Sequence, residues 1–314
     1  MIGVYGADGF IGRHLVRYLA ARGAPVRAVS RKFDPSFVTS VSGSVEFVEG
    51  DLGQPLAMAS SLQDVTTVVQ LISSSSPGLM NDHAVADITE NVVPHVQFLQ
   101  NCLRAGVKRY IFLSSGGTVY GPDAPVPTPE TCPTNPISSH GLTKLFVEKY
   151  ILMHGHVDGL EYVILRVANP FGPGQTYRKG QGLVPAIVDR WQKGLPIRVF
   201  GDGAARRDYI YIDDVIEAVD AAIRLDGAPR LVLNIGSGEA RSVTEVIEAI
   251  EKAAGYAFDK EFVATRSTDV AVACLDISKA RRILNWAPKI EFRAGIASTV
   301  AHLGTRAVTK PNLA

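Results

Sequence analysis

The amino-acid sequence predicts an α/β protein, in which a doubly wound parallel β-sheet is followed by a smaller, mainly helical C-terminal lobe. In the first half of the chain, short apolar runs alternate with stretches of helical periodicity, which is typical of successive β–α–β units. The apolar runs are nearly continuous, as in strands that helices cover on both faces. After residue 167 glycine- and proline-rich segments replace this alternation and predict a second lobe.

The elements of the first half follow from these patterns in chain order. We expect strands at residues 2–5, 26–29, 45–48, 65–72, 110–114 and 162–167. Helices are expected at residues 10–21, 89–105 and 141–154, the second of them bent or begun near Pro94.

The second half contains fewer clear strands. Residues 169–182 are expected to form a long loop, 183–193 a helix, and 197–200 a short strand. Residues 209–212 and 231–235 read as buried strands that could return to the first sheet, and residues 243–314 as mostly helical. We therefore expect one domain at residues 1–170 with returning segments at about 209–235. The second lobe would comprise residues 171–208 and 236–314.

Composition excludes several classes of protein. Of 314 residues, 46% are hydrophobic and 20% charged, which excludes intrinsic disorder. The net charge is +1, so no basic surplus favours nucleic acid, and no apolar run approaches the ~18 residues of a membrane span. Three cysteines without a CxxC pair and scattered histidines argue against a disulfide framework and a metal site. We expect a cytoplasmic protein.

A glycine-rich turn joins the first predicted strand to the first helix. Gly6 and Gly9 would allow a tight turn and close approach of a pyrophosphate, and Gly12 would let helix and strand pack closely. Phe10 and Ile11 open the helix, whose N-terminal amides would face the phosphates. The turn predicts a dinucleotide site on a Rossmann-type sheet.

The ends of the second and third strands bear on which dinucleotide binds. The second strand ends in Ser30, Arg31 and Lys32 instead of the carboxylate that would bind ribose hydroxyls. Two cations and a hydroxyl suit a 2′-phosphate, so NADP is slightly favoured over NAD, unless these residues are only a solvated loop. Asp51 and Leu52 follow the third strand and would either meet the adenine edge or cap a helix.

Five ordered motifs extend over most of the chain. They are Gly6-x-x-Gly9-x-x-Gly12, the run from Ser114 to Gly121, His140-x-x-x-Lys144, the run from Leu165 to Gly174, and the run from Arg207 to Asp214. Together they resemble the extended short-chain dehydrogenase/reductases, the group of UDP-galactose 4-epimerase and related nucleotide-sugar epimerases, dehydratases and ketoreductases. The resemblance covers the chain to about residue 282.

The resemblance implies a catalytic centre in which two of three positions differ here. In the family a Tyr and a Lys four residues later share one helix face; the Lys binds the nicotinamide ribose, and a Ser or Thr orients the sugar hydroxyl. Lys144 matches, but His140 stands at the Tyr and Gly116 at the Ser/Thr. An imidazole with its ordinary pKa of ~6.5 is a workable acid/base, or it only fills the slot. Ser115 and Thr118 are neighbouring hydroxyls, and Thr118 is the better placed, unless its role is structural.

The resemblance also implies a nucleotide-sugar site in the second lobe. Asn169 would contact the diphosphate, and Arg207 and Arg266 would pair with its phosphates, unless they form surface ion pairs. The short strand around Val199 would meet the nucleotide base through its backbone. At Ala273, a small side chain leaves room for an N-acetyl group. Hydroxyls of the serine run at residues 73–76 could contact nicotinamide or sugar, or form only a loop.

These features predict an NAD(P)-dependent nucleotide-sugar 4-epimerase with an atypical catalytic centre and a UDP-sugar as the favoured substrate. One alternative is an NADPH-dependent 4-ketosugar reductase. Another is a protein that binds dinucleotide and nucleotide sugar without catalysis, as the loss of Tyr and Ser would suggest. The resemblance further implies a homodimer in which the helices at 89–105 and 141–154 pack against their copies. We expect neither a nucleic-acid nor a membrane partner.

Overall fold

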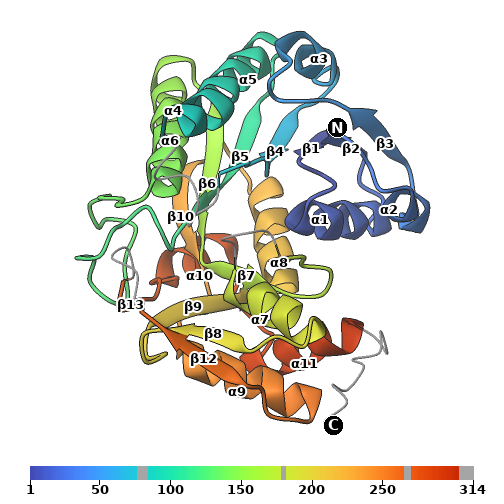
Figure 1. The fold of residues 1–314 in the computed structure, drawn as a ribbon. Helices are drawn as coiled ribbons and strands as arrows, with labels where there is room; N and C mark the ends of the chain where they lie inside the picture. Colours follow the sequence, from blue (N-terminus) through green and yellow to red (C-terminus); the bar gives the residue numbers. More distant parts are fainter. Residues whose placement is uncertain (76–83, 178–181, 265–269, 304–314) are drawn as a thin grey trace.

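The computed structural model describes residues 1–75, 84–177, 182–264 and 270–303, and its larger lobe is built on a seven-stranded sheet (Figure 1). The strands are parallel and lie in the order β10-β6-β5-β4-β1-β2-β3. Their bounds are β1 Ile2–Tyr5, β2 Val26–Ser30, β3 Val45–Glu49, β4 Thr67–Gln70, β5 Arg109–Ser115, β6 Glu161–Val167 and β10 Arg230–Ile235. This order reverses between β1 and β4, where doubly wound sheets bind their ligands. The predicted fold class is confirmed.

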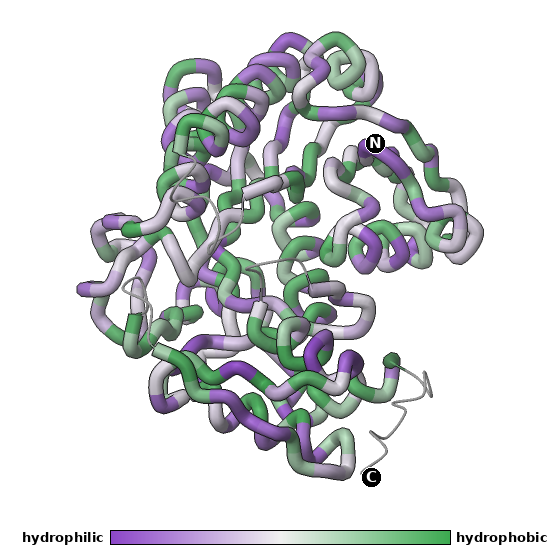
Figure 2. Tube along the Cα trace, viewed as in Figure 1, coloured by the Kyte–Doolittle hydropathy of each residue, from purple (hydrophilic) through white to green (hydrophobic). Residues whose placement is uncertain are grey.

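Helices cover both faces of this sheet. On one face α1 packs against α8, and on the other α5 packs against α3 and α6. The covering helices carry both hydrophilic and hydrophobic residues (Figure 2), because each has one face in the core and one in water. The helices of this lobe are α1 Phe10–Ala21, α2 Pro35–Ser40, α3 Pro55–Ser60, α4 Ala84–Asp87, α5 Val93–Arg104, α6 Ser139–Val157 and α8 Ile212–Ile223.

The region predicted as one helix at 89–105 consists of two parts. Residues Ile88–Val92 form a π-helical turn that directly follows α4, and α5 begins at Val93 with Pro94 in its first turn. Pro94 is tolerated there because its missing N–H would have no partner in the first turn. The start near Pro94 is therefore confirmed, and the wider π turn before it was not predicted.

The second lobe contains strands as well as helices. Its helices are α7 Leu183–Gln192, α9 Val243–Ala254, α10 Ser278–Leu284 and α11 Phe292–His302. A four-stranded sheet combines β7 Asn169–Phe171, β9 Arg206–Tyr211, β11 Ala240–Ser242 and β13 Val272–Ala273, and a two-stranded sheet pairs β8 Ile197–Phe200 with β12 Lys260–Val263. Helix α9 begins with a capping box of Ser242 and Glu245 and ends at Gly255, where φ is +82°.

Three expectations for the second half need correction. Residues 209–212 do not return to the first sheet, because β9 is paired with β7, β11 and β13; only the 231–235 segment returns, as β10 beside β6. The segment 169–182 is not entirely loop, since it opens with β7. The segment 243–314 contains β12, whose residues are mostly exposed, and the half-buried, two-residue β13. Both strands are short and therefore leave little apolar pattern.

Candidate functional site

The glycine turn after β1 has the geometry of a pyrophosphate cradle. Gly6 has φ +89°, and a Cβ on Gly12 would lie 2.2 Å from the Gly6 carbonyl oxygen. Both positions therefore require glycine. Helix α1 begins at Phe10, and its N-cap residue Gly9 offers no side-chain hydrogen bond, so the first N–H groups are left for a ligand. These residues fit a dinucleotide, whose phosphates they would hold.

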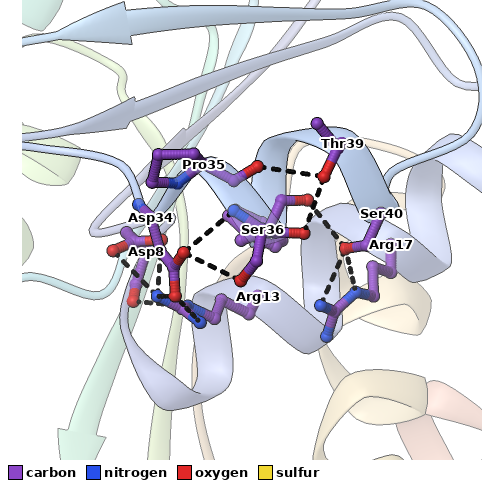
Figure 3. Close-up of polar contacts among 9 residues, drawn as sticks. Asp8, Arg13, Arg17, Asp34, Pro35, Ser36, Thr39 and Ser40 are labelled. Carbon is purple, nitrogen blue, oxygen red and sulfur yellow. Dashed lines mark hydrogen bonds and ion pairs between the residues drawn. The ribbon is translucent and has the colours of Figure 1, made fainter.

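The end of β2 presents cations rather than a free carboxylate. Arg31 and Lys32 are exposed, and Ser30 is half-buried. The nearby carboxylate of Asp34 accepts hydrogen bonds from Ser36, whose backbone N lies 2.9 Å away, and thereby caps α2 (Figure 3). These bonds lower the pKa of Asp34. The Asp34 carboxylate is thus engaged in capping α2 and does not stand free at the end of β2.

Arg13 crosses from α1 to the same edge. Its guanidinium lies 3.0 Å from Asp8 and 3.4 Å from Asp34 (Figure 3), and it ties the glycine turn to the start of α2. After β3, the Asp51 carboxylate accepts from the Gly53 backbone N at 2.9 Å, and Leu52 is buried. Asp51 therefore stabilises a turn, close to the structural role considered for it.

The inward face of α6 carries the predicted catalytic residues. His140, Lys144 and Glu148 recur every four residues, so they lie on one side of the helix, and all three are buried. The Ser138 side chain caps the helix N-terminus by accepting from the Gly141 backbone N at 3.2 Å. The spacing that the sequence indicated is thus realised on a helix packed against β5.

Lys144 sits against the carboxyl end of β5. Its Nζ donates to the Leu113 carbonyl at 3.0 Å and lies 4.9 Å from the centre of the Phe112 ring. Burial lowers the pKa of Lys144 to about 8, and the Glu148 carboxylate opposes this shift. The ammonium has spare N–H donors for a ribose hydroxyl.

Only one of the two ring nitrogens of His140 makes a hydrogen bond within the described residues. Its Nδ1 lies 3.2 Å from Ser75 Oγ, and its Nε2 makes no hydrogen bond within the described residues. Burial, followed by the Lys144 charge, lowers the pKa of His140 to about 4, while Asp87 and Ser75 oppose the shift. At neutral pH the imidazole is therefore uncharged and able to accept a proton.

The turn after β5 explains the missing serine. A Cβ on Gly116 would lie 2.5 Å from Leu275 Cδ1 and 2.9 Å from the Arg166 carbonyl oxygen, so the space for a side chain is filled by Leu275 of the second lobe and by the backbone of β6. The Thr118 hydroxyl is buried and has no hydrogen-bond partner in the described residues. Buried hydroxyls normally have a hydrogen-bond partner, so Thr118 is an exception among the described residues. Ser115 is half-buried, and its backbone carbonyl oxygen accepts hydrogen bonds from the amides of residues 118 and 119.

A cavity lies between the two lobes beside this turn. It is lined by Gly116, Gly117, Asn169 and Ala273 together with Asp208 and other residues of the second lobe. The Asn169 side chain donates to the Asp208 carbonyl at 2.8 Å. The buried Asp208 carboxylate accepts from the backbone N–H groups of residues 237, 238 and 275, so it organises the cavity wall and does not pair with Arg207.

The other residues predicted to bind the substrate are Arg207, Val199 and Arg266. Arg207 lies on β9, and its Nη1 donates to the carbonyl oxygens of Arg206 and Val270 at 2.9 and 2.6 Å. Val199 is buried on β8, so only its backbone is available to a ligand. Arg266 and Ser76 lie outside the described residues.

Three structural partners of the site escaped sequence reasoning. Glu148 is buried between Arg166, 2.7 Å away, and the Ser114 hydroxyl, which donates to it. Asp87 is fully buried among serines and an asparagine, and Leu275 covers Gly116. The spacing of four residues from Lys144 to Glu148 was the only sequence pattern that could have identified one of these partners. Asp87 and Leu275 reach the site from distant segments of the chain.

Two searches of the described residues bear on other classes of function. They contain no group of three or more His, Cys, Asp or Glu side chains placed to hold a metal ion. No helix in these ranges is long and apolar enough to cross a membrane.

Comparison with known proteins places this geometry among relatives. A model described as the NAD dependent epimerase/dehydratase family matches residues 2–236. The UDP-glucose 4-epimerase of Mycolicibacterium smegmatis is 33% identical over 303 residues, which are 95% of this chain and 96% of the relative.

Two similar solved structures contain ligands. UDP-glucose 4-epimerase of Thermotoga maritima with UDP-glucose has a TM-score of 0.89 and 31% identity, and the match covers 96% of this chain and 98% of that chain. The Thermus thermophilus UDP-glucose 4-epimerase with NAD has a TM-score of 0.88 and 30% identity, with coverage of 97% and 99%. NAD is thus the dinucleotide that the comparisons name, and they do not support a preference for NADP.

Proposed function

The chain belongs to the NAD-dependent epimerase/dehydratase family, and from that premise we propose that it is a nucleotide-sugar 4-epimerase in which His140 takes the place of tyrosine as the proton-transfer residue. The membership confirms the family resemblance found in the motifs. A dinucleotide bound at the glycine turn would supply the acceptor and donor for hydride at sugar C4.

The geometry of α6 is the observation that carries this proposal. Lys144 is a buried ammonium with spare donors, and His140, one turn earlier, is an uncharged imidazole whose Nε2 is open. Lys144 would bind the nicotinamide ribose, and His140 would accept the proton of the sugar 4-hydroxyl. After the keto sugar has turned and hydride has returned to the opposite face of C4, His140 would give this proton back to O4. The unpartnered hydroxyl of Thr118 supports its role in orienting that sugar oxygen; Ser115 is a second hydroxyl at the same turn.

The proposed substrate follows from the family resemblance, and the cavity between the lobes, whose wall includes Asn169 and Ala273, supports it. Asn169, Arg207 and Arg266 would contact the diphosphate of a UDP-sugar, and the backbone at Val199 would meet the base. The small side chain of Ala273 in the cavity wall supports acceptance of an N-acetylated sugar.

For the dinucleotide, family membership favours NAD, whereas Ser30, Arg31 and Lys32 at the end of β2 remain the feature that would favour NADP. The absence of a free carboxylate there supports testing both. Titration with each dinucleotide separates the two, because a 2′-phosphate held by Arg31 tightens binding and makes it salt-dependent.

We also propose a homodimer through α5 and α6. Several apolar residues of these two helical regions, among them Val92, Leu99 and Ile151, are buried in the chain's own core. Exposed apolar side chains nevertheless remain on these elements: Val85, Ile88 and Val93 near the start of α5, and Leu142, Phe146, Met153 and Val157 along α6. Such a patch on adjoining helices is suited to a second copy.

The test is NMR of UDP-glucose, UDP-N-acetylglucosamine and their C4 epimers, each incubated with protein and NAD or NADP. Inversion at C4 that is lost in His140→Phe supports the proposal, and inversion that survives removes His140 from it. Stoichiometric oxidation of NADPH by a 4-keto sugar without inversion supports the reductase instead. Saturation transfer to the sugar nucleotide without turnover supports a binding protein.

A further inference from the structure

A chain of buried polar groups leads from His140 to a carboxylate on another helix. Ser75, in the segment that follows β4, donates from Oγ to Asp87 Oδ2 at 3.1 Å, and the same Oγ lies 3.2 Å from His140 Nδ1. Asp87 ends α4 and is fully buried. A carboxylate removed from water and joined through one hydroxyl to the proposed acid/base residue is costly unless it interacts with a positive group.

The other contacts of Asp87 are hydrogen bonds that its carboxylate oxygens accept. Ser139 Oγ donates to Oδ2 at 2.6 Å, and Asn91 Nδ2 donates to Oδ1 at 2.8 Å. With Ser75, three donors therefore converge on oxygens that act only as acceptors, which is the pattern of an ionised carboxylate. The π-helical turn Ile88–Val92 places Asn91 beside Asp87 and in contact with the loop after β4, so the arrangement is built into the fold.

The directions of these hydrogen bonds determine which ring nitrogen of neutral His140 carries the proton. A serine hydroxyl has one hydrogen, and that of Ser75 is given to Asp87. Ser75 Oγ can then only accept from His140, so Nδ1 carries the proton and Nε2 carries the lone pair. The neutral imidazole is thereby held in the one tautomer that leaves Nε2 as a base.

We propose, on the basis of the proposed function, that Asp87 and Ser75 are positioning residues that orient His140 as the Nδ1–H tautomer and stabilise the imidazolium formed when Nε2 accepts the sugar hydroxyl proton. In that step the O4–H bond breaks and the Nε2–H bond forms. The electron pair left on O4 forms the carbonyl as hydride leaves C4 for the nicotinamide of the dinucleotide. Return of hydride and proton reverses the balance, so His140 ends each turnover neutral.

The charges around His140 show why such a partner is needed. Lys144, on the same helix, disfavours the imidazolium, as does burial, and Asp87 on α4 is the carboxylate that opposes them. His95 on α5 is itself buried, with its pKa lowered to about 4, and is neutral at pH 7. Without Asp87, the carboxylate that offsets the desolvation and the Lys144 charge would be missing when His140 takes up a proton.

The first experiment reads the tautomer directly in the full-length protein with ¹⁵N-labelled histidine and no substrate. The His140 signals, assigned with His140→Phe, are expected to show a protonated Nδ1 and an unprotonated Nε2. In Ser75→Ala this pattern is expected to become a mixture of tautomers. An Nε2–H tautomer in the wild type, or the same single tautomer in Ser75→Ala, overturns the proposal.

The second experiment measures the pH dependence of kcat and kcat/KM for epimerisation. Because Asp87 raises the pKa of His140, Asp87→Asn is expected to move the acidic limb of kcat/KM to lower pH and to reduce kcat by on the order of tenfold or more, with KM unchanged. Asp220→Asn, which changes an equally buried aspartate on α8, is the matched control and should keep the limb. If Asp87→Asn changes neither the pH of the acidic limb of kcat/KM nor kcat, the proposed role of Asp87 and Ser75 is refuted. If the wild type inverts no sugar, the proposed function fails, while the tautomer measurement still decides whether Ser75 orients His140.

Discussion

Replacing Gly116 by serine introduces the residue that the family resemblance implies at this position, and the structure predicts that the chain will not accept it. The new Cβ would lie 2.5 Å from Leu275 Cδ1 and 2.9 Å from the backbone oxygen of Arg166. Ordinary carbon–carbon contacts are ~3.5–4.0 Å, so Leu275 must move by about 1 Å. Leu275 is 4% exposed and packed in the core, and the Arg166 carbonyl belongs to β6. Overpacking of this kind costs about 1–3 kcal/mol.

Gly117→Ser is the matched control for this prediction. The nearest atom to a Cβ at Gly117 is Asn169 Nδ2 at 4.0 Å, so this substitution adds the same group to the adjacent residue without a clash. Urea unfolding should show that Gly116→Ser lowers the free energy of unfolding by about 1–3 kcal/mol, with a change within ~0.5 kcal/mol for Gly117→Ser.

A double-mutant cycle with Leu275→Ala tests the cause. Leu275→Ala alone should cost about 2–5 kcal/mol, but in that background Gly116→Ser should cost less than it does in the wild type, because the methyl group at 2.5 Å is gone. A coupling of at least ~0.5 kcal/mol is expected. Equal stability of Gly116→Ser and the wild type, or strict additivity in the cycle, would refute the reasoning.

Four further predictions follow from other contacts. Glu148→Gln leaves Arg166 as an uncompensated buried charge, so the free energy of unfolding measured in urea should fall by about 3–5 kcal/mol. Burial lowers the pKa of His95 to about 4, and the unfolded chain therefore takes up this proton first; stability should fall by about 3 kcal/mol from pH 6.5 to 4, and His95→Gln should reduce that loss. Ala273→Tyr should lower kcat/KM for UDP-N-acetylglucosamine relative to UDP-glucose by on the order of tenfold, as competition assays would show. Phe146→Glu should convert a dimer to a monomer in light scattering, whereas a wild-type monomer would exclude the dimer.

The parts of the molecule that the sequence predicted are those encoded by local patterns. The strands of the first sheet have strongly apolar runs. The glycine turn has no room for side chains at Gly6 and Gly12, and the spacing of the glycines in the sequence already indicates this. Strands with weak patterns were missed: β12 has four residues, and its Phe262 is 63% exposed. The sheet to which β9 belongs was also predicted wrongly, because strand pairing depends on distant partners that no local pattern specifies.

The site was predictable where two residues share one helix and unpredictable where separate segments meet. Lys144 follows His140 at helical spacing, so both could be placed on one face. Asp87 looked like one of several acids near a helix start, and only the fold brings it to Ser75. Leu275 is likewise brought to Gly116 by the packing of the second lobe, which is why the missing serine could be noticed in the sequence but not explained from it.

The ion pair of Glu148 and Arg166 has a consequence for how this protein could diverge from its relatives. It fastens α6 to β6 about two helical turns after His140, and Ser114 adds a link to β5. The orientation of the helix is therefore determined at a point separate from the proposed proton-transfer residue. A mutation at position 140 can replace one acid/base group with another while the helix keeps its place. Architecture and chemistry are inherited through different residues, and selection can act on them one at a time.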